Sequence, residues 1–551
     1  MKWVIPILLV SLVYILDVRY FSTPPLYSDD WVQVAQQIFC KMKFADWSNR
    51  RPFLLAPLAV LTPMLGIRLQ YYYLVNFLVI FSSGVLLYII VRRAFPRFPW
   101  LSLPVALICL IYPVDYTRTW VTMLTYHLVF LTDLIILLLL MEYAKSGRRW
   151  QLLLAPLLFL CSLGVTEGGL GIVTLGSILL ACVTRNAPIG RRLGLLSVSL
   201  TAVVFVVWRT VVQHGLMHVH DSYYAQLDTS IATLVSRYVI GFLVFMFGWI
   251  GPLFGSLGPT KYAILAAAGV ALTGVLLVFL LRSIRLARSD DSFDWVERKR
   301  MVRYLLLVSL VGLLFWVAGF VPVIGLRQPC FAGGDTRDNL VAIAGASVSL
   351  VAGLASLAAL KAGSSDRVRV LTRVGVIPLL VLGLFYQCWS QNERFKAWGE
   401  QRKLWNLMFE TVPGLTDHST VIIVTPGFSG ARQFQIPPFS ARWEAAGALK
   451  TLYNDPSLNA TYYFPDLPHR GANLLEDSVE WSQFVLVYYD PAKPSLEVVE
   501  RPEERLALPF QFAGYSPDKR IVAQSPQSQA YRWLVKQTAA GSSKVTAEGT
   551  D

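Results

Sequence analysis

Residues 69–93 read LQYYYLVNFLVIFSSGVLLYIIVRR, in which a long stretch without a charged side chain ends at a pair of arginines. A helix that crosses a membrane needs about 20 consecutive, predominantly apolar residues. Basic residues are enriched at the cytoplasmic ends of such helices. This stretch therefore predicts a membrane-spanning helix at 69–91 whose carboxyl end lies in the cytoplasm.

Comparable apolar runs recur along the chain and set its class. Hydrophobic residues make up 55% of the 551 residues, charged residues only 15%, and the mean hydropathy is +0.51. The runs are continuous, whereas the strands of a membrane β-barrel alternate apolar and polar residues. We therefore predict a polytopic α-helical membrane protein.

Basic clusters between the runs divide the chain into spans. The predicted spans are roughly 3–20, 69–91, 100–114, 121–142, 150–165, 168–184, 193–212, 303–324, 338–360 and 370–389. Two further runs, 238–257 and 262–281, must together cross an odd number of times, and glycines and a proline favour the first as re-entrant. The total is about 11 spans, with the N-terminus in the cytoplasm and the C-terminus outside the plasma (inner) membrane. A total of about 12 would instead leave the C-terminal part in the cytoplasm.

The first outer loop, residues 22–68, is long and is predicted to carry two interfacial segments. Apolar residues from Trp31 to Phe39 fall at helical spacing, which indicates an amphipathic surface helix at 29–40. The run 52–66 is apolar but too short to span a membrane, and prolines interrupt it, so we expect it at the interface.

The composition becomes more polar after the last predicted span. The expected units are a transmembrane domain at 1–390, a juxtamembrane helix at 391–414, a small extracytoplasmic α/β domain at 415–537 and a disordered tail at 538–551. The α/β domain is predicted to contain strands at 420–424, 460–464 and 483–489 and a helix at 440–453.

The formal net charge is +14. The basic residues lie in short loops between spans and not on one face interleaved with aromatic residues, so a nucleic-acid partner is not expected. Positive-inside bias and contact with anionic membrane lipids account for the excess.

A doubled acid, Asp29 and Asp30, follows the first predicted span in the stretch PPLYSDDWVQV (24–34). Adjacent carboxylates repel one another, which favours a proton on one of them and suits proton transfer. Ser28 and the two acids also have the composition of a helix N-terminus, where they would satisfy backbone N–H groups and the helix dipole. Both interpretations stay open, and one acid could cap a helix while the other reacts.

Three short motifs carry a resemblance to a known family: SDDW (28–31), the basic and aromatic NRRPF (49–53), and the acidic turn GVTEGG (164–169). Their placement in a long outer loop and between short spans, over roughly residues 1–390, resembles the GT-C superfamily of integral membrane glycosyltransferases. That superfamily includes protein O-mannosyltransferases and the aminoarabinose transferase of lipid A. The resemblance implies transfer of a sugar from a polyprenyl-phosphate donor to a hydroxyl at the extracytoplasmic face, with a glycan, lipid or protein as acceptor.

The resemblance makes Asp29 or Asp30 the general base that takes the proton of the acceptor hydroxyl. The leaving phosphate needs cationic groups. The candidates are arginines predicted near the outer face, namely Arg50, Arg51, Arg118, Arg327 and Arg337. Each of them could instead contact lipid headgroups or pair with an acid. Glu167 lies in an acidic turn where a charge is costly unless it is used or paired, and we expect it to bind sugar hydroxyls.

A second polar motif, HVHD (218–221), contains His218, His220 and Asp221 in a predicted outer loop. In extended backbone the two histidines share a side, which suits a divalent metal that bridges to phosphate. The alternative is a polar loop without a metal. The chain has no P-loop and no GxGxxG motif, so the energy of any reaction is expected to come from elsewhere than bound ATP. A divalent metal is considered as a cofactor only at the HVHD motif. His127, within a predicted span, is expected to be a hydrogen-bonded core residue.

Two other classes of function also fit many spans, outer arginines and membrane acids. They are a transporter or flippase of lipid-linked glycans, and a non-catalytic assembly scaffold. Transporters often carry paired repeats with broken helices at matching positions, and this chain shows one irregular segment without a second copy. The enzyme hypothesis predicts that Asp29 or Asp30 shares one pocket with Glu167 and some of the outer arginines.

Overall fold

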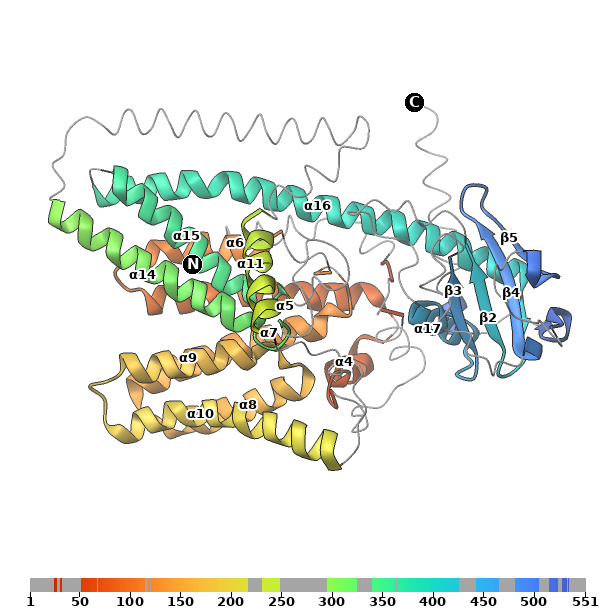
Figure 1. Cartoon of the computed structure of the whole chain (residues 1–551), viewed down its shortest axis with the longest axis horizontal. Helices are drawn as coiled ribbons and strands as arrows, with labels where there is room; N and C mark the ends of the chain where they lie inside the picture. Colours follow the sequence, from red (N-terminus) through yellow and green to blue (C-terminus); the bar gives the residue numbers. More distant parts are fainter. Residues whose placement is uncertain are drawn as a thin grey trace.

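The apolar runs fold into a bundle of helices, and a small sheet lies beyond one end of it (Figure 1). The structure is a computed structural model. The residues that it describes are 24–26, 30–31, 51–66, 68–113, 117–118, 120–216, 230–247, 295–324, 339–362, 364–425, 442–464, 481–504, 515–523, 528–532 and 534. The predicted span at 3–20, the predicted surface helix beyond Trp31, the run 262–281 and the tail at 538–551 lie outside these residues.

The helices of the bundle follow the predicted spans closely. Their bounds are α4 (Ala56–Leu65), α5 (Leu69–Ala94), α6 (Ser102–Ile111), α7 (Met123–Ser146), α8 (Arg149–Val165), α9 (Leu170–Val183), α10 (Ile189–Val207), α11 (Ile231–Phe247), α14 (Trp295–Phe320), α15 (Ala342–Lys361) and α16 (Ser365–Thr411). The short 3₁₀ helices η2 (Pro99–Leu101) and η3 (Glu167–Gly169) precede α6 and α9, and the π-helical segment η4 (Trp208–Leu216) extends α10.

Within the described ranges, six helices are long and apolar enough to cross a membrane: α5, α7, α10 with the start of η4, α14, α15 and α16. The helices α4, α8 and α11, α6 with η2 and α9 with η3 are apolar but shorter. The protein is therefore mainly helical, with several helices of membrane-spanning character and a small region of strands. The total of about 11 spans stays a prediction.

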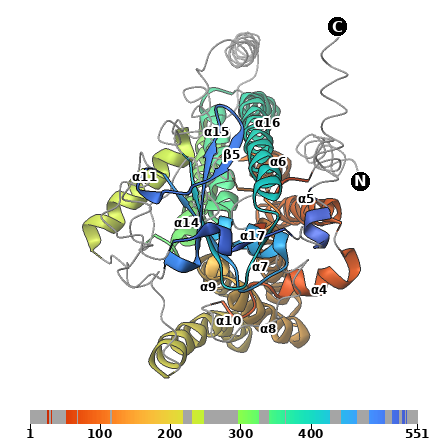
Figure 2. The same cartoon turned by 90° about the vertical axis from the view of Figure 1, so that its right-hand side faces the viewer.

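The outward faces of several helices are strongly apolar. Leu153 on α8, Leu200 on α10 and Leu307 on α14 are 75%, 59% and 56% exposed. The helix α7 lies near the centre of the bundle (Figure 2), with 67% of its most apolar segment buried, against 22% for α10. Soluble proteins rarely expose contiguous apolar faces of this kind. A bundle whose outer helices present leucine to their surroundings has the character of a helical membrane protein.

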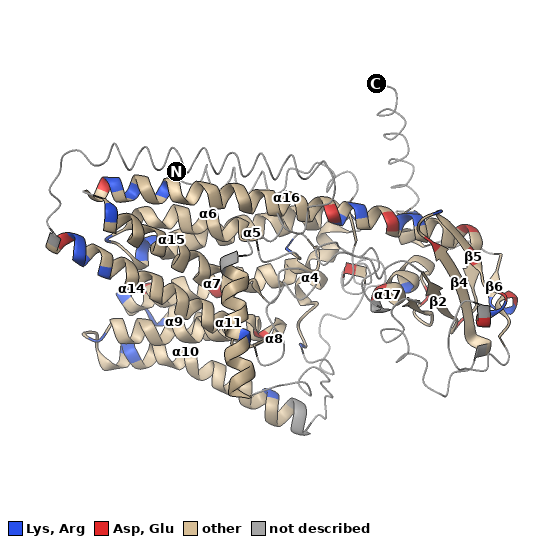
Figure 3. Cartoon of the chain, turned by 45° about the horizontal axis from the view of Figure 1, so that its top comes forward, with Lys and Arg blue, Asp and Glu red and all other residues tan. Residues whose placement is uncertain are grey.

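Lys and Arg residues gather at the end of the bundle that lies away from the sheet (Figure 3). The helices α5 and α7 end side by side there, where Arg93 forms an ion pair with Glu142. The helices α8 and α10 begin at this basic end, with Arg149 and Arg191 in their first turns. The opposite end, which we call the sheet end, therefore receives the first turns of α5, α7 and α9 and the last turns of α8 and α10.

The helices α14 and α15 pack closely because glycines face each other across the contact. A Cβ atom at Gly345 would lie 2.2 Å from the backbone nitrogen of Trp316, and one at Gly312 would lie 2.4 Å from that of Ser349. Small residues allow helix backbones to approach within a membrane, where dispersion contacts replace the hydrophobic effect as the driving force for packing.

The C-terminal region forms a four-stranded sheet in the order β3-β2-β4-β5, from β2 (Thr420–Val424), β3 (Asn459–Tyr463), β4 (Phe484–Asp490) and β5 (Ser495–Val498). The strand β2 is parallel to β3 and β4, and β5 is antiparallel to β4. A separate antiparallel pair joins β1 (Gly414–Leu415) to β6 (Ile521–Val522). The helix α17 (Arg442–Tyr453) packs on β3. The three predicted strands and the predicted helix are thus confirmed, with ends shifted by at most two residues.

The last predicted span and the predicted juxtamembrane helix at 391–414 are one helix. The helix α16 runs unbroken over 47 residues, with Pro378 in its interior. It is therefore about 70 Å long, more than twice the roughly 30 Å hydrocarbon core of a bilayer. Its second half leaves the bundle and reaches the sheet (Figure 1).

The sequence after 390 predicts an apolar stripe that lies beside the membrane, made of Phe395, Trp398, Trp405, Met408 and Phe409. The structure corrects this, because the stripe packs into the interior of the protein. Trp398 and Trp405 belong to one hydrophobic core with Trp31 of the first loop and Val421 of β2. This shared core fastens the first loop and the sheet to the same helix.

We predict that Gly345→Ala lowers the stability of the protein, because its new methyl group would meet backbone atoms of α14 that have nowhere to move. Overpacking of this kind costs about 1–3 kcal/mol. The measurement is thermal unfolding of the purified full chain in detergent. Gly375→Ala is the matched control: it lies in α16 with open space around its Cβ position, and should leave stability unchanged or raise it, by up to about 1 kcal/mol. Equal effects of the two changes would contradict the close approach of α14 and α15.

Candidate functional site

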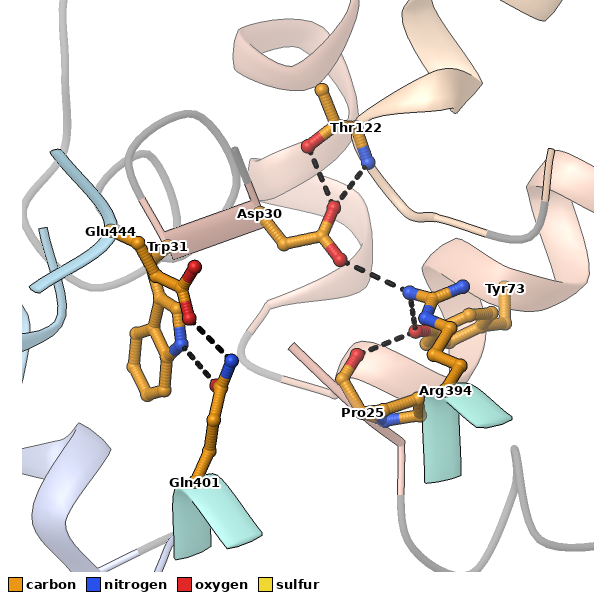
Figure 4. A network of polar contacts seen from close by, with 8 residues as sticks. All are labelled: Pro25, Asp30, Trp31, Tyr73, Thr122, Arg394, Gln401 and Glu444. Carbon is orange, nitrogen blue, oxygen red and sulfur yellow. Dashed lines mark hydrogen bonds and ion pairs between the residues drawn. The ribbon is translucent and has the colours of Figure 1, made fainter. Parts of the chain in front are cut away.

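Asp30, the second acid of SDDW, is fully buried where α7 begins (Figure 4). Its Oδ1 accepts hydrogen bonds from the backbone N–H of Thr122, at 2.8 Å, and from the Thr122 hydroxyl, at 2.6 Å. Thr122 is the N-cap of α7. A helix N-terminus has backbone N–H groups without intrahelical partners and favours a negative charge. Asp30 thus caps a helix, as one interpretation of the sequence proposed, but the helix is α7, distant in the sequence.

The second oxygen of Asp30 pairs with Arg394 of α16, with 3.1 Å between Oδ2 and Nη2 and both side chains almost wholly buried. The same Nη2 donates to the Tyr73 hydroxyl of α5 at 3.0 Å, and the guanidinium carbon lies 5.8 Å from the centre of the Tyr73 ring. The Tyr73 hydroxyl in turn donates to the carbonyl oxygen of Pro25 at 2.6 Å. The ion pair therefore joins the first loop to α5, α7 and α16.

Trp31, the next residue, ties the same loop to the sheet region (Figure 4). Its Nε1 donates to Oε1 of Gln401 at 3.1 Å, and Nε2 of Gln401 donates to the Glu444 carboxylate on α17. The rings of Trp398 and Trp405 lie 6.1 Å and 6.4 Å from the Trp31 ring, centre to centre. Both described residues of SDDW are thus held in place by α16.

Glu167 occupies the short η3 turn between α8 and α9, as the sequence predicted, and is buried. Arg51 binds it with two nitrogens, since Nε and Nη2 each lie 3.0 Å from Oε2. Arg209, in η4, pairs through Nη1 with the other carboxylate oxygen. Arg51 also donates from Nη1 to the Tyr126 hydroxyl at 3.1 Å. The three charged side chains keep 15%, 12% and 9% of their surface exposed for Arg51, Arg209 and Glu167, so the cluster is reachable from outside.

The start of α7 carries both clusters. Thr122 binds Asp30, and Tyr126, four residues later, binds Arg51. Four residues of α-helix advance by about 6 Å. The buried Asp30 pair and the Arg51–Glu167 pair are therefore attached to neighbouring turns of one helix at the sheet end of the bundle.

Arg118 lies in the same connection, just before α7. It is buried, and its Nη1 donates to the carbonyl oxygen of Cys109 in α6 at 3.0 Å. Of the predicted phosphate-binding residues, the structure thus places Arg51 in the Glu167 cluster and directs Arg118 into the bundle. His127 is buried, with Nδ1 2.6 Å from Oδ1 of Asn76, which confirms the prediction of a hydrogen-bonded core residue.

Seven predicted site residues lie outside the described residues: Asp29, Arg50, Arg327, Arg337, His218, His220 and Asp221. Their roles stay predictions. In the part of the chain that the structure describes, no group of three or more His, Cys, Asp and Glu side chains is arranged to hold a metal ion.

Two arginines of the site were missed from the sequence. Arg209 lies near the end of the predicted span 193–212, which begins after a basic loop. Arg209 is therefore predicted near the outer face, by the same argument that selected Arg118. Arg394 directly precedes Phe395, which belongs to the apolar stripe of α16. A charged side chain next to such a stripe is often buried together with an oppositely charged partner. No pattern in the sequence distinguishes Thr122.

The arrangement favours different tasks for the two acids. Asp30 has no exposed surface and accepts hydrogen bonds from Thr122 and Arg394, so it fixes its neighbours in place. Glu167 orients two guanidinium groups at a partly open position. Guanidinium N–H groups match the oxygens of phosphate and carboxylate in a bidentate manner. The sheet end of the bundle therefore combines a rigid acid-bearing loop with a group able to bind an anion.

A scan against models of known protein families finds no match for the chain, and a search of curated proteins finds none either.

We expect Asp30→Asn and Arg394→Leu each to destabilise the protein by about 3–5 kcal/mol, because each leaves one charge of a buried pair without its partner. The double variant should lose at least about 1 kcal/mol less than the sum of the two single losses, since neither charge then remains. Denaturation of the full chain in detergent micelles measures all three. Strictly additive losses would show that the two side chains are not coupled.

Proposed function

We propose that the protein is a membrane glycosyltransferase of GT-C type, which moves a sugar from a polyprenyl-phosphate donor to an acceptor hydroxyl at the extracytoplasmic face. One observation carries the proposal. Asp30 of the doubled acid and the Arg51–Glu167–Arg209 cluster meet neighbouring turns of α7, at the end of the bundle opposite the basic end. Positive-inside bias makes the basic end cytoplasmic, so the acids and anion-binding arginines belong to the other side.

The reaction needs a base for the acceptor and cations for the leaving group. The acceptor oxygen attacks the anomeric carbon while its proton passes to a carboxylate. The bond from that carbon to the phosphate oxygen breaks, and polyprenyl phosphate leaves with the electron pair. No nucleotide is consumed, because the sugar–phosphate bond of the donor is already activated.

Each described side chain receives a task in this scheme. Arg51 and Arg209 bind the phosphate, where their charge stabilises the leaving group as it forms. Glu167 holds the two guanidinium groups in fixed positions relative to each other. This differs from the sequence analysis, which expected Glu167 to contact sugar hydroxyls. Asp30 is a positioning residue, since its oxygens are engaged by Thr122 and Arg394. We therefore assign proton removal to the adjacent Asp29.

The long α16 supports the same proposal from the acceptor side. Trp31 and Gln401 link the acid-bearing loop to Glu444 of the sheet region. A soluble region held against the loop would be well placed to bring a glycan, a lipid headgroup or a protein segment to the base. The identity of the sugar and of the acceptor is left to experiment.

The test is release of polyprenyl phosphate by the full chain in nanodiscs, with a panel of polyprenyl-phosphate sugars and a membrane extract as the source of acceptor. Asp29→Asn should reduce the rate about 10²–10⁴-fold, the usual contribution of a general base. Arg51→Gln and Arg209→Gln should each reduce it by about 10²-fold or more, since each removes a charge that stabilises the leaving phosphate. Glu142→Gln is the matched control, because Glu142 also pairs with an arginine but at the basic end, and its rate should equal that of the wild type.

The outcomes separate the enzyme from its alternatives. If no donor is turned over but the carrier binds tightly and moves between leaflets, the chain is a flippase of lipid-linked glycans. If Asp30→Asn abolishes release in a folded protein and Asp29→Asn does not, the base is Asp30 and our assignment is wrong.

A further inference from the structure

A groove of about 530 Å³ lies far from the acid clusters, at the basic end of the bundle. It is bounded by α5, by η2 and the first turns of α6, and by the first half of α16. Its volume falls within the roughly 300–1,000 Å³ that is typical of small-molecule sites. The mechanism proposed above makes no use of it.

Three arginines line the groove, Arg92 from α5 and Arg369 and Arg373 from α16. All three side chains are exposed, and none of the described residues that line the groove is acidic. Asp366 pairs with Arg369 from outside the lining, at 3.1 Å. Arg92 donates to the Tyr88 hydroxyl at 2.8 Å, which holds its guanidinium at the edge of the groove. The groove therefore attracts an anion, even after the charge of Asp366 is counted.

The rest of the lining is mainly apolar. The basic residues and the apolar residues follow each other in order along the helices that form the groove. Along α16, Arg369 and Arg373 come first, and Val376, Ile377 and Leu380 follow. From Arg373 to Leu380 the helix advances by about 10 Å. The groove therefore runs from a cationic mouth at the end of the bundle to an apolar floor deeper along α16.

The α6 side repeats this order. Trp100, in η2, comes first along this side of the lining, and Leu103 and Leu107 follow along α6. Tryptophan is enriched at the level of lipid headgroups, where an apolar ring meets a polar surface. The η2–α6 segment and the first half of α16 are far apart in sequence. Both nevertheless change from residues suited to lipid headgroups to residues suited to hydrocarbon in the same direction along the groove.

We propose that this groove is a binding site for an anionic glycerophospholipid. Its phosphate is held by Arg92, Arg369 and Arg373, and an acyl chain lies along Val376, Ile377 and Leu380. Basic pockets between transmembrane helices at the cytoplasmic side suit such headgroups. A zwitterionic lipid lacks the excess negative charge that three arginines select. The proposal is independent of the glycosyltransferase activity, because the groove and the acid clusters lie at opposite ends of the bundle.

Native mass spectrometry of the delipidated full chain tests the proposal, with phosphatidylglycerol and phosphatidylcholine of identical acyl chains as the two probes. One phosphatidylglycerol molecule should bind in preference to phosphatidylcholine. Each arginine near an anionic headgroup contributes roughly fivefold, so Arg92→Gln, Arg369→Gln and Arg373→Gln together should weaken phosphatidylglycerol binding about 100-fold. The matched control is Arg148→Gln with Arg149→Gln, two exposed arginines at the start of α8, which should leave the preference intact.

A second variant keeps the test decisive if the triple variant does not fold. Ile377→Trp fills the apolar part of the groove from a position that is 38% exposed, so the fold should tolerate it. Each displaced methylene contributes about fourfold to binding, and loss of two should weaken both lipids about 15-fold.

Four results would overturn the proposal. The wild type could bind the two lipids equally, or the α8 control could lose as much binding as the triple variant. Alternatively, polyprenyl phosphate could displace phosphatidylglycerol from the wild type at equal concentration, which would make the groove a carrier site. A dimer of the chain that dissociates in Ile377→Trp would likewise assign the groove to protein association.

Discussion

The buried ion pair between Asp30 and Arg394 joins the first loop to a helix that lies hundreds of residues away in the sequence. Asp30 brings the first loop to the N-terminus of α7, and Arg394 brings α16 to the Tyr73 face of α5. Two charges out of water are costly unless each oxygen and each N–H group finds a partner. The surrounding hydrogen bonds therefore leave little freedom in how these helices meet.

The Glu167 cluster uses the same construction in a more open setting. Arg51 and Arg209 come from segments on either side of α8 and α9, and their shared carboxylate fixes both guanidinium groups at the sheet end of the bundle. One acid is sealed inside the protein and the other stays partly accessible, although both are bound by arginine. Burial, and not the type of partner, separates a structural pair from a group that can bind a ligand.

Hydropathy located most of the helices, because a membrane requires apolar runs of a fixed minimum length. The strand β2 was also predictable from its composition. Val421 and Ile423 face one hydrophobic core and Ile422 and Val424 face another, so residues 421–424 are all apolar. The turn at Glu167 was predictable as well, because a charged residue between two apolar runs is expected in the turn that connects them. Such features depend on local sequence alone.

The continuity of α16 and the pairs across the site were not predictable in the same way. The polar residues after 390 mark a change of surroundings, but Glu, Gln, Lys and Arg favour helix as strongly as the apolar residues before them. The change in composition at about residue 390 therefore marks where the surroundings of α16 change. It does not mark the end of one helix and the start of another. The partners Thr122 and Arg394 lie 92 and 364 residues from Asp30, and no local pattern records such a contact.

The separation of 364 residues between Asp30 and Arg394 also has a consequence in time. A ribosome adds about 5–20 residues per second, so roughly 20–70 s pass between the synthesis of the carboxylate and that of its guanidinium partner. During this interval the first loop has α5 and α7 to contact but lacks the helix that neutralises it. The acid-bearing loop is thus among the first parts of the protein to be made, and its ion pair with α16 is among the last contacts that can form.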